Sequence, residues 1–171
     1  MIALVGFTGT GKSTIGRLLA LSHGFLCFDV DALIEQHAGK TIREIFSQDG
    51  EPGFRKIESK LIYDIVTACV AKHAVLVTGA GAVLSEQTRE LLRNRCFTVH
   101  VDTPLDLVIA RLTGDSQRPL LQGSDRVKMI QALYETRKDL YTFSHVRVSQ
   151  PEAGLAVAAI LAKHMEWRDR L

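Results

Sequence analysis

Nine residues near the start of the chain carry the clearest chemical signal in the sequence. They read Gly6-Phe7-Thr8-Gly9-Thr10-Gly11-Lys12-Ser13-Thr14, with four residues between Gly6 and Gly11 and then Lys and Ser. Glycines allow successive backbone N–H groups to turn inward around phosphate oxygens. Lys12 adds a mobile positive charge for the β- and γ-phosphates, and the Ser13 hydroxyl suits Mg²⁺. The stretch predicts a binding site for a nucleoside triphosphate.

The residues on both sides of this loop have the character that such a site requires. Residues 2–5 form a short apolar run that predicts a buried strand, and residues 15–21 carry apolar side chains at helical spacing. A helix that begins here adds its partial positive charge to the phosphate site. The alternative is a glycine-rich turn that binds nothing, and the Lys-Ser pair at the correct offset disfavours it.

Two carboxylates follow the next predicted strand, residues 25–28. Asp29 and Asp31 would lie at the carboxyl end of that strand, which is the edge where parallel α/β sheets bind ligands. One carboxylate could hold the water shell of a metal ion while the other binds a substrate hydroxyl. The alternative is that Asp29 only caps the helix that follows.

Residues 50–58, Gly-Glu-Pro-Gly-Phe-Arg-Lys-Ile-Glu, begin with turn residues and run into a long amphipathic helix that we expect to reach about residue 72. Arg55 near the start of that helix opposes the helix dipole. An arginine in this position indicates an anionic partner, such as a ligand carboxylate held in bidentate fashion. The alternative is a salt bridge to Glu58 at helical spacing, which could also aim the guanidinium at a ligand.

Small residues follow the most strand-like run of the chain, residues 74–78. Gly79, Ala80 and Gly81 would let a ligand approach the backbone closely at the end of that strand. The alternative is a tight turn from strand to helix. Further on, His100 sits within a strand-like alternation, and we interpret it as structural rather than catalytic.

A polar loop is predicted after Arg111, where the preceding helix breaks at Gly114. A loop this polar, bounded by glycines and placed at about residues 112–124, is typical of a closing lid. Arg118 in its middle could stabilise the charge on a transferring phosphate, or it could be a solvated loop arginine. The next predicted helix, residues 125–141, carries Arg137 and Tyr141 one turn apart on one face.

Composition indicates one compact soluble domain that spans residues 1–171. The chain is 46% hydrophobic and 23% charged, and its net charge of +2 is spread along the sequence, so we expect no nucleic-acid or membrane partner. We expect a cytoplasmic protein, because neither a signal peptide nor a membrane-spanning run is evident, and we expect it to be a monomer. The three cysteines, Cys27, Cys69 and Cys96, are interpreted as buried free thiols.

The predicted elements alternate between strand and helix along the chain. This alternation favours a parallel sheet covered by helices. Five strands are predicted, at residues 2–5, 25–28, 74–78, 97–101 and 146–148. Predicted helices include residues 32–37, 41–46, 85–94 and 153–165.

These motifs, in this order, resemble those of the shikimate kinases over nearly the whole chain. The resemblance rests on the loop GFTGTGKST, the Asp29/Asp31 pair, the string GEPGFRKIE, the turn after Thr78, RPLL at residues 118–121, and Arg137 followed by Tyr141. The phosphate-binding loop alone indicates only a nucleotide, whereas FRxxE together with RPLL is far more specific. The resemblance implies a P-loop NTPase-type three-layer α/β/α fold with a five-stranded parallel sheet, similar to nucleoside monophosphate kinases, and a lid loop.

The same resemblance implies a kinase that uses ATP and Mg²⁺ to convert shikimate into shikimate 3-phosphate, on the way to chorismate and the aromatic amino acids. Residues that would bind ATP are Gly9, Thr10, Gly11, Lys12, Ser13, Thr14, Arg111 and Arg118. Ser13 would bind Mg²⁺ and Asp29 its coordinating waters, while Arg111 would pack on the adenine.

On the substrate side, the resemblance assigns residues within a helical region at about 31–60 and beyond it. Residues that would bind shikimate are Asp31, Arg55, Gly79, Ala80, Gly81 and Arg137. Arg55 and Arg137 would clamp its carboxylate, and Asp31 would bind the reacting hydroxyl and act as base. Lys12, Asp31 and Arg118 would be the catalytic residues.

The chain departs from the resemblance at Ala80, where the family usually has the middle of three glycines. Alanine suits a backbone contact if its φ is negative, whereas a positive φ would put shikimate binding in question. Two alternatives are another small-metabolite kinase of the same architecture, such as a gluconate kinase, and a regulatory protein that binds the ligands without catalysis.

Overall fold

The computed structural model describes residues 1–69, 71, 73–113, 125–149 and 152–170. Its centre is a five-stranded sheet in the order β2-β3-β1-β4-β5, and each neighbouring pair of strands is parallel. The strands are β1 (Ile2–Val5), β2 (Leu26–Asp29), β3 (Ala74–Val77), β4 (Phe97–Val101) and β5 (Val146–Val148). The expected five-stranded parallel sheet is confirmed.

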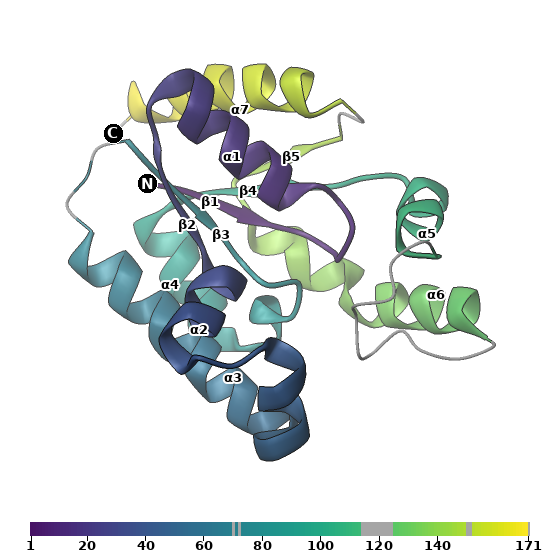
Figure 1. Ribbon diagram of the computed structural model, residues 1–171. Helices are drawn as coiled ribbons and strands as arrows, with labels where there is room; N and C mark the ends of the chain where they lie inside the picture. Colours follow the sequence, from purple (N-terminus) through teal and green to yellow (C-terminus); the bar gives the residue numbers. More distant parts are fainter. Residues whose placement is uncertain (70, 72, 114–124, 150–151, 171) are drawn as a thin grey trace.

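Helices cover both faces of this sheet (Figure 1). On one face lie α1 (Lys12–His23) and α7 (Ala153–Arg168). On the other face lie α2 (Val30–Ala38), α3 (Ile42–Ala68), α4 (Glu86–Arg95), α5 (Leu105–Thr113) and α6 (Arg126–Arg137), with the 3₁₀ helices η1 (Ala82–Leu84) and η3 (Lys138–Phe143). In the described part of the chain, no helix is both long enough and apolar enough to cross a bilayer.

The alternation of side chains along β1 explains why the fold has two cores. Ile2 and Leu4 point to the face covered by α1 and α7, while Ala3 and Val5 point to the opposite face, and all four are fully buried. Strands buried on both sides read as continuous apolar runs, and this is the pattern that predicted them. The layered architecture therefore follows directly from these short runs.

The strand order places the phosphate-binding loop at the centre of the carboxyl edge. The chain leaves β1 toward β2 on one side and leaves β3 toward β4 on the other. Such a reversal opens a crevice beyond the carboxyl ends of the strands, where open α/β sheets bind ligands. The loop after β1, the end of β2 and the turn after β3 all lie at this edge (Figure 1).

Two helix predictions were wrong in detail. The helix that holds Arg55 ends at Ala68 rather than near residue 72, and it is continuous with the segment from Ile42 through a kink at Gly50, where φ is 67° and ψ is −178°. A capping box between Thr41 and Glu44 fixes its start. The helix expected over 125–141 ends as α-helix at Arg137 and continues as the 3₁₀ helix η3.

The cysteine prediction was correct in part. All three cysteines have free thiols, but only Cys96 is buried, whereas Cys27 and Cys69 are half-buried. Cys27 lies on β2, which is an edge strand, and Cys69 follows the last residue of α3. Both positions lie at the margin of the apolar layers, so apolar neighbours in sequence did not guarantee burial.

His164 provides a test of how α7 docks on the sheet. It is buried, and its ring lies 5.2 Å from the ring of Phe97 and stacks on Trp167. Burial lowers the pKa of His164 to about 4, so the unfolded chain binds a proton between pH 6.5 and 4 that the folded chain does not. Stability therefore falls as the pH falls through that window.

We predict that His164→Phe loses less thermal stability than the wild type between pH 7.5 and pH 5. Between these pH values, the free energy of unfolding should fall by about 1–2 kcal/mol less in the variant than in the wild type. The reason is that phenylalanine keeps the packing and cannot take up a proton. Melting curves at three pH values measure it. His37→Gln, at an exposed histidine of α2, serves as the control and should follow the wild type. Equal acid sensitivity of His164→Phe and the wild type would contradict the prediction.

Candidate active site

The phosphate-binding loop is held in shape by its own side chains. Lys12 is buried, and its Nζ donates hydrogen bonds to the carbonyl oxygens of Gly6 at 2.8 Å and Phe7 at 2.9 Å. Thr10 Oγ1 also donates to Phe7 O, at 2.8 Å. Gly11, with φ 92°, forms the N-cap of α1. The Lys12 ammonium therefore lies within the loop, directly before the N-terminus of a helix, where anions are stabilised.

Gly6 is required by a close contact as well as by its backbone angle. Its φ is 151°, and a Cβ at this position would overlap the carbonyl oxygen of Val101 at the end of β4. Thr103, just beyond β4, donates from Oγ1 to Thr10 O at 3.1 Å. The loop is thus packed against the carboxyl end of the neighbouring strand, which fixes its position relative to the sheet.

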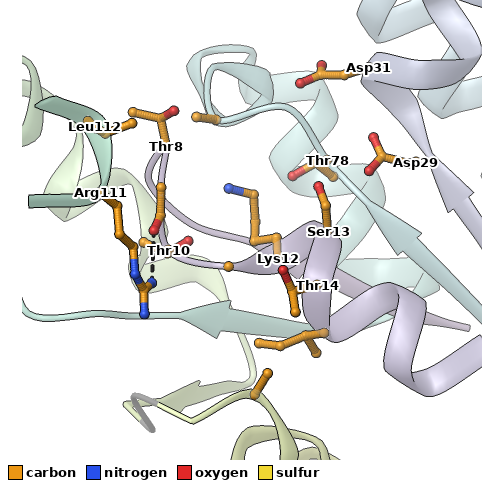
Figure 2. A pocket seen from close by; sticks show the side chains of 15 residues that line it. Thr8, Thr10, Lys12, Ser13, Thr14, Asp29, Asp31, Thr78, Arg111 and Leu112 are labelled. Carbon is orange, nitrogen blue, oxygen red and sulfur yellow. Dashed lines mark hydrogen bonds between the residues drawn. The ribbon is translucent and has the colours of Figure 1, made fainter. Parts of the chain in front are cut away.

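A cavity of about 470 Å³ lies over this loop (Figure 2). Its lining joins the phosphate-binding loop to residues from β2, α2, the turn after β3, α5 and the start of α7. The lining residues are Thr8, Gly9, Thr10, Gly11, Lys12, Ser13, Thr14, Ile15, Asp29, Asp31, Thr78, Ala80, Arg111, Leu112 and Ala153. The cavity therefore contains most of the residues that were expected to bind a nucleotide and a metal ion.

Asp29 and Asp31 both face this cavity (Figure 2). Asp29 is the last residue of β2 and the N-cap of α2, yet its side chain makes no capping hydrogen bond. The capping alternative is thus not supported by the geometry. Asp31 follows in the first turn of α2. Because Ser13 also lines the cavity, it offers a hydroxyl and two carboxylates, which are the hard oxygen ligands that Mg²⁺ prefers.

Arg111 lies at the rim of the same cavity. Its Nη1 donates to Gly9 O at 3.0 Å, and the neighbouring Leu112 side chain packs against Gly9 (Figure 2). The end of α5 is therefore seated on the phosphate-binding loop, and α5 is the element that leads into the expected lid. Arg118 and residues 114–124 lie outside the described residues, so the predicted lid over 112–124 is seen only at its first two residues.

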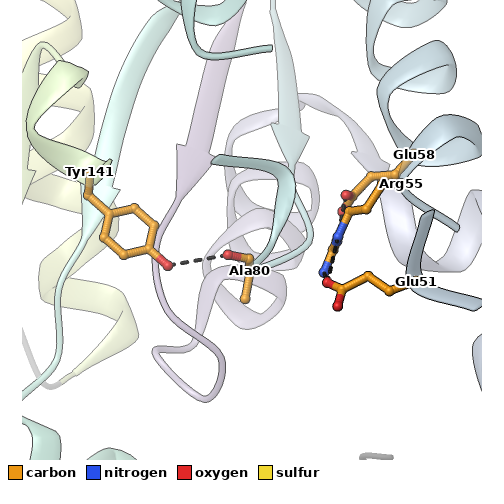
Figure 3. Close-up of polar contacts among 5 residues, drawn as sticks. All are labelled: Glu51, Arg55, Glu58, Ala80 and Tyr141. Carbon is orange, nitrogen blue, oxygen red and sulfur yellow. Dashed lines mark hydrogen bonds and ion pairs between the residues drawn. The ribbon is translucent and has the colours of Figure 1, made fainter. Parts of the chain in front are cut away.

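Arg55 is held between two carboxylates (Figure 3). Its Nη1 lies 2.6 Å from Glu58 Oε2, and its Nε and Nη2 lie 3.2 Å and 3.0 Å from Glu51 Oε1. The expected salt bridge to Glu58 is confirmed, whereas the sequence analysis missed Glu51. The guanidinium carbon also lies 5.1 Å from the centre of the Phe54 ring. These contacts fix the orientation of the Arg55 guanidinium.

Glu58 connects this arginine to Asp31. Its side chain is 1% exposed, and burial raises its pKa above the usual range, while Arg55 opposes the shift and the negative charge of Asp31 adds to it. Its Oε1 is buried and has no hydrogen-bond partner among the described residues. A buried acceptor of this kind is uncommon in proteins. Glu58 therefore forms an ion pair with Arg55 and lies close to the Asp31 carboxylate that lines the cavity.

The turn after β3 lines the cavity and also packs against Arg55 and Glu58. A Cβ at Gly79 would overlap Glu58 Oε1, and a Cβ at Gly81 would overlap the Arg55 guanidinium. Neither glycine has a positive φ, so both are required by contact with α3 rather than by backbone angle. Ala80 also has a negative φ and lines the cavity, so its methyl group introduces no backbone strain.

Arg137, the last residue of α6, is the second arginine of this region. It is 6% exposed, and no ion pair or hydrogen bond joins it to another described residue. The largest influence on the pKa of Arg137 is burial, which lowers it. The positive charge of Arg55 lowers this pKa further, whereas the negative charges of Glu51 and Glu58 raise it. A buried arginine beside a second arginine is a ready site for an anion.

The structure thus brings the predicted residues together in two adjoining groups. The phosphate-binding loop, Asp29, Asp31, Ala80 and Arg111 line the cavity, and the Arg55 and Glu58 side chains pack on the adjoining 79–81 turn. The sequence analysis missed several lining residues, namely Ile15, Thr78, Leu112 and Ala153. Their residue types carry no chemical signal, and only the tertiary fold brings them to the cavity.

Comparison with known proteins agrees with this arrangement. The chain is 39% identical over 146 residues to the shikimate kinase of Synechococcus elongatus, which covers 85% of this chain and 75% of that protein. The structure of shikimate kinase from Acinetobacter baumannii in complex with shikimate superposes with a TM-score of 0.86 at 34% identity, and covers 99% of this chain and 93% of that one.

A gluconokinase from Sinorhizobium meliloti shares the fold with a TM-score of 0.56 at 18% identity, and it covers 99% of this chain and 93% of that one. At that identity the likeness concerns the fold alone. The family model described as shikimate kinase matches residues 8–166, which include the phosphate-binding loop from Thr8 onward, Asp29 and Asp31, and Arg55 and Arg137. Because this match covers most of the chain, the protein belongs to the shikimate kinase family.

Proposed function

We propose that this protein transfers the γ-phosphoryl group of ATP to the 3-hydroxyl of shikimate, giving shikimate 3-phosphate and ADP. One observation carries the proposal. The half-buried Arg55 packs on the 79–81 turn and interacts electrostatically with the buried Arg137, and the same turn lines the cavity with the phosphate-binding loop and Asp31. This arrangement suits an acceptor that has a carboxylate at one end and a hydroxyl at the other.

On the donor side, ATP is the phosphate donor of the family, and the 9–14 backbone would hold its phosphates. Lys12 would neutralise charge on the β- and γ-phosphates, since its ammonium already lies within the loop. Ser13 and Asp29 would hold Mg²⁺ and its waters, and the bound ion would neutralise phosphate charge.

On the acceptor side, Arg55 and Arg137 would clamp the carboxylate of shikimate. Asp31 would orient the 3-hydroxyl toward the γ-phosphorus. As the new P–O bond forms, the bond to the ADP oxygen breaks, and the hydroxyl proton passes to Asp31. Phosphoryl transfer depends mainly on positioning and charge neutralisation, so these groups together with the expected lid residue Arg118 are sufficient.

Two alternatives are less well supported. A gluconate kinase would also need a phosphate-binding loop and a site for a carboxylate, but the likeness to the gluconokinase structure is limited to the fold. A regulatory protein without catalysis would not need Lys12 and Asp31 to face one cavity. We also propose that the protein acts as a cytoplasmic monomer without nucleic-acid or membrane partners, in keeping with its evenly distributed charge.

The direct test is a coupled assay of ADP release over a panel of hydroxy acids that includes shikimate and gluconate. Of the hydroxy acids in the panel, we expect only shikimate to be turned over. This turnover should require Mg²⁺. Removal of the metal with EDTA should abolish turnover, and added Mg²⁺ should restore it. Preference for gluconate, or shikimate binding without ADP release, would reject the proposed reaction.

We predict that substitutions of catalytic residues chiefly lower kcat, whereas substitutions of substrate-binding residues chiefly raise KM. Lys12→Ala and Arg118→Ala should lower kcat by at least about 100-fold, because both groups stabilise charge at the transferring phosphate. Arg55→Lys should chiefly raise KM for shikimate, because lysine keeps the charge beside Glu58 but loses the planar fork. Normal turnover of Arg118→Ala would remove that residue from the mechanism.

We also predict that Gly81→Ala raises KM for shikimate by about 10-fold or more and leaves KM for ATP nearly unchanged. The added Cβ would displace the Arg55 guanidinium, and a displaced binding group can cost one or two orders of magnitude. Gly154→Ala is the matched control, because a Cβ at Gly154 meets nothing within 4 Å. Equal kinetics of the two variants would show that Arg55 does not depend on this contact.

A further inference from the structure

Tyr141 is a buried tyrosine to which the proposed reaction assigns no role. It lies on η3, its side chain is among the largest of the fully buried ones, and it is 1% exposed. Its hydroxyl donates a hydrogen bond to the carbonyl oxygen of Ala80 at 3.3 Å (Figure 3). Tyr141 therefore connects the end of the α6 segment to the turn that lines the cavity.

The ring of Tyr141 is held firmly. It stacks on His100 of β4, with 4.7 Å between the ring centres and 14° between the ring planes. Burial lowers the pKa of His100 to about 4, so this histidine is neutral near pH 7. Burial also raises the pKa of Tyr141 above its usual value, so the hydroxyl keeps its proton and remains a donor. The polar end of a fixed ring thus points at the turn.

The hydrogen bond also sets the direction of the next N–H group. The Ala80 carbonyl and the Gly81 N–H belong to one planar trans peptide, in which the two groups point in opposite directions. Because the carbonyl points toward Tyr141, the Gly81 N–H points away from it, toward the side of the turn where Arg55 lies (Figure 3). Among the described residues, no acceptor is found for this N–H.

The turn is therefore held from two sides. Arg55 and Glu58 pack directly on the backbone of Gly81 and Gly79 on one side, and the Tyr141 hydroxyl holds the Ala80 carbonyl on the other. Tyr141 also follows Arg137 by four residues and raises the pKa of that arginine. One short segment thus carries the second arginine and the group that orients the turn.

We infer that Tyr141 is a positioning residue for the substrate site: its hydroxyl orients the Ala80–Gly81 peptide so that the Gly81 N–H is presented, beside Arg55, to an anionic substrate group. The inference rests on the proposed function for the identity of that group, a carboxylate. A backbone N–H next to a guanidinium adds a hydrogen bond of fixed direction, and such bonds to a charged group are stronger than neutral ones.

The test is Tyr141→Phe, which removes one oxygen and keeps the ring on His100. We expect KM for shikimate to rise about 3- to 10-fold, as loss of one hydrogen bond would cause, while kcat and KM for ATP stay within about twofold. Tyr63→Phe removes the same atom from an exposed tyrosine of α3 and should leave all three values unchanged. A lower melting temperature of Tyr141→Phe with an unchanged KM for shikimate would reduce Tyr141 to a structural role and overturn the inference.

A second measurement does not depend on the substrate. Hydrogen–deuterium exchange of the ligand-free protein over residues 78–84 should be faster in Tyr141→Phe than in the wild type, because the hydrogen bonds from Ala82 N to Gly79 O and from Leu84 N to Gly81 O lie in this turn. Tyr63→Phe should match the wild type. Unchanged exchange would overturn the inference, whereas a wild type that does not phosphorylate shikimate would overturn only the proposed function.

Discussion

The arrangement of the site depends on one ion pair, that of the half-buried Arg55 with the buried Glu58, and on its contact with the turn after β3. The guanidinium lies directly on Gly81 and the carboxylate directly on Gly79, so α3 can take its position only if both residues lack a side chain. Removing one partner of a buried pair leaves an uncompensated charge, which typically costs about 3–5 kcal/mol. The pair thus ties α3 to the turn at the end of β3.

The donor half of the site has a separate origin. It arises from the order of the strands, because β1 lies between β3 and β4 and delivers its loop to the middle of the carboxyl edge. Gly6 then packs on the end of β4, and the end of α5 packs on Gly9. The proposed nucleotide site and the proposed acceptor site are therefore held in place by different contacts. The two sites adjoin at Asp31 and Ala80, which line the cavity over the phosphate-binding loop.

Much of the fold could be predicted from the sequence, because buried parallel strands leave continuous apolar runs and the phosphate-binding loop has a distinctive pattern. Details that depend on packing could not be predicted. Glu51 pairs with Arg55 only because the chain is already helical at that point, whereas Gly50 and Pro52 indicated a turn. The glycines of the 79–81 turn were expected to admit a ligand, and it is the side chains of α3 that require them. Nothing in the sequence showed that Tyr141 would reach Ala80 from a 3₁₀ helix.

The hydrogen bonds of Lys12 have a consequence for how the nucleotide binds. Because the ammonium already bridges the carbonyls of Gly6 and Phe7, the cradle has its curved shape before any ligand arrives. The backbone of the loop therefore loses little conformational entropy when the nucleotide binds. A receptor that is preorganised in this way generally binds its ligand more tightly. Ordering costs would fall instead on whichever segments close over the bound triphosphate afterwards.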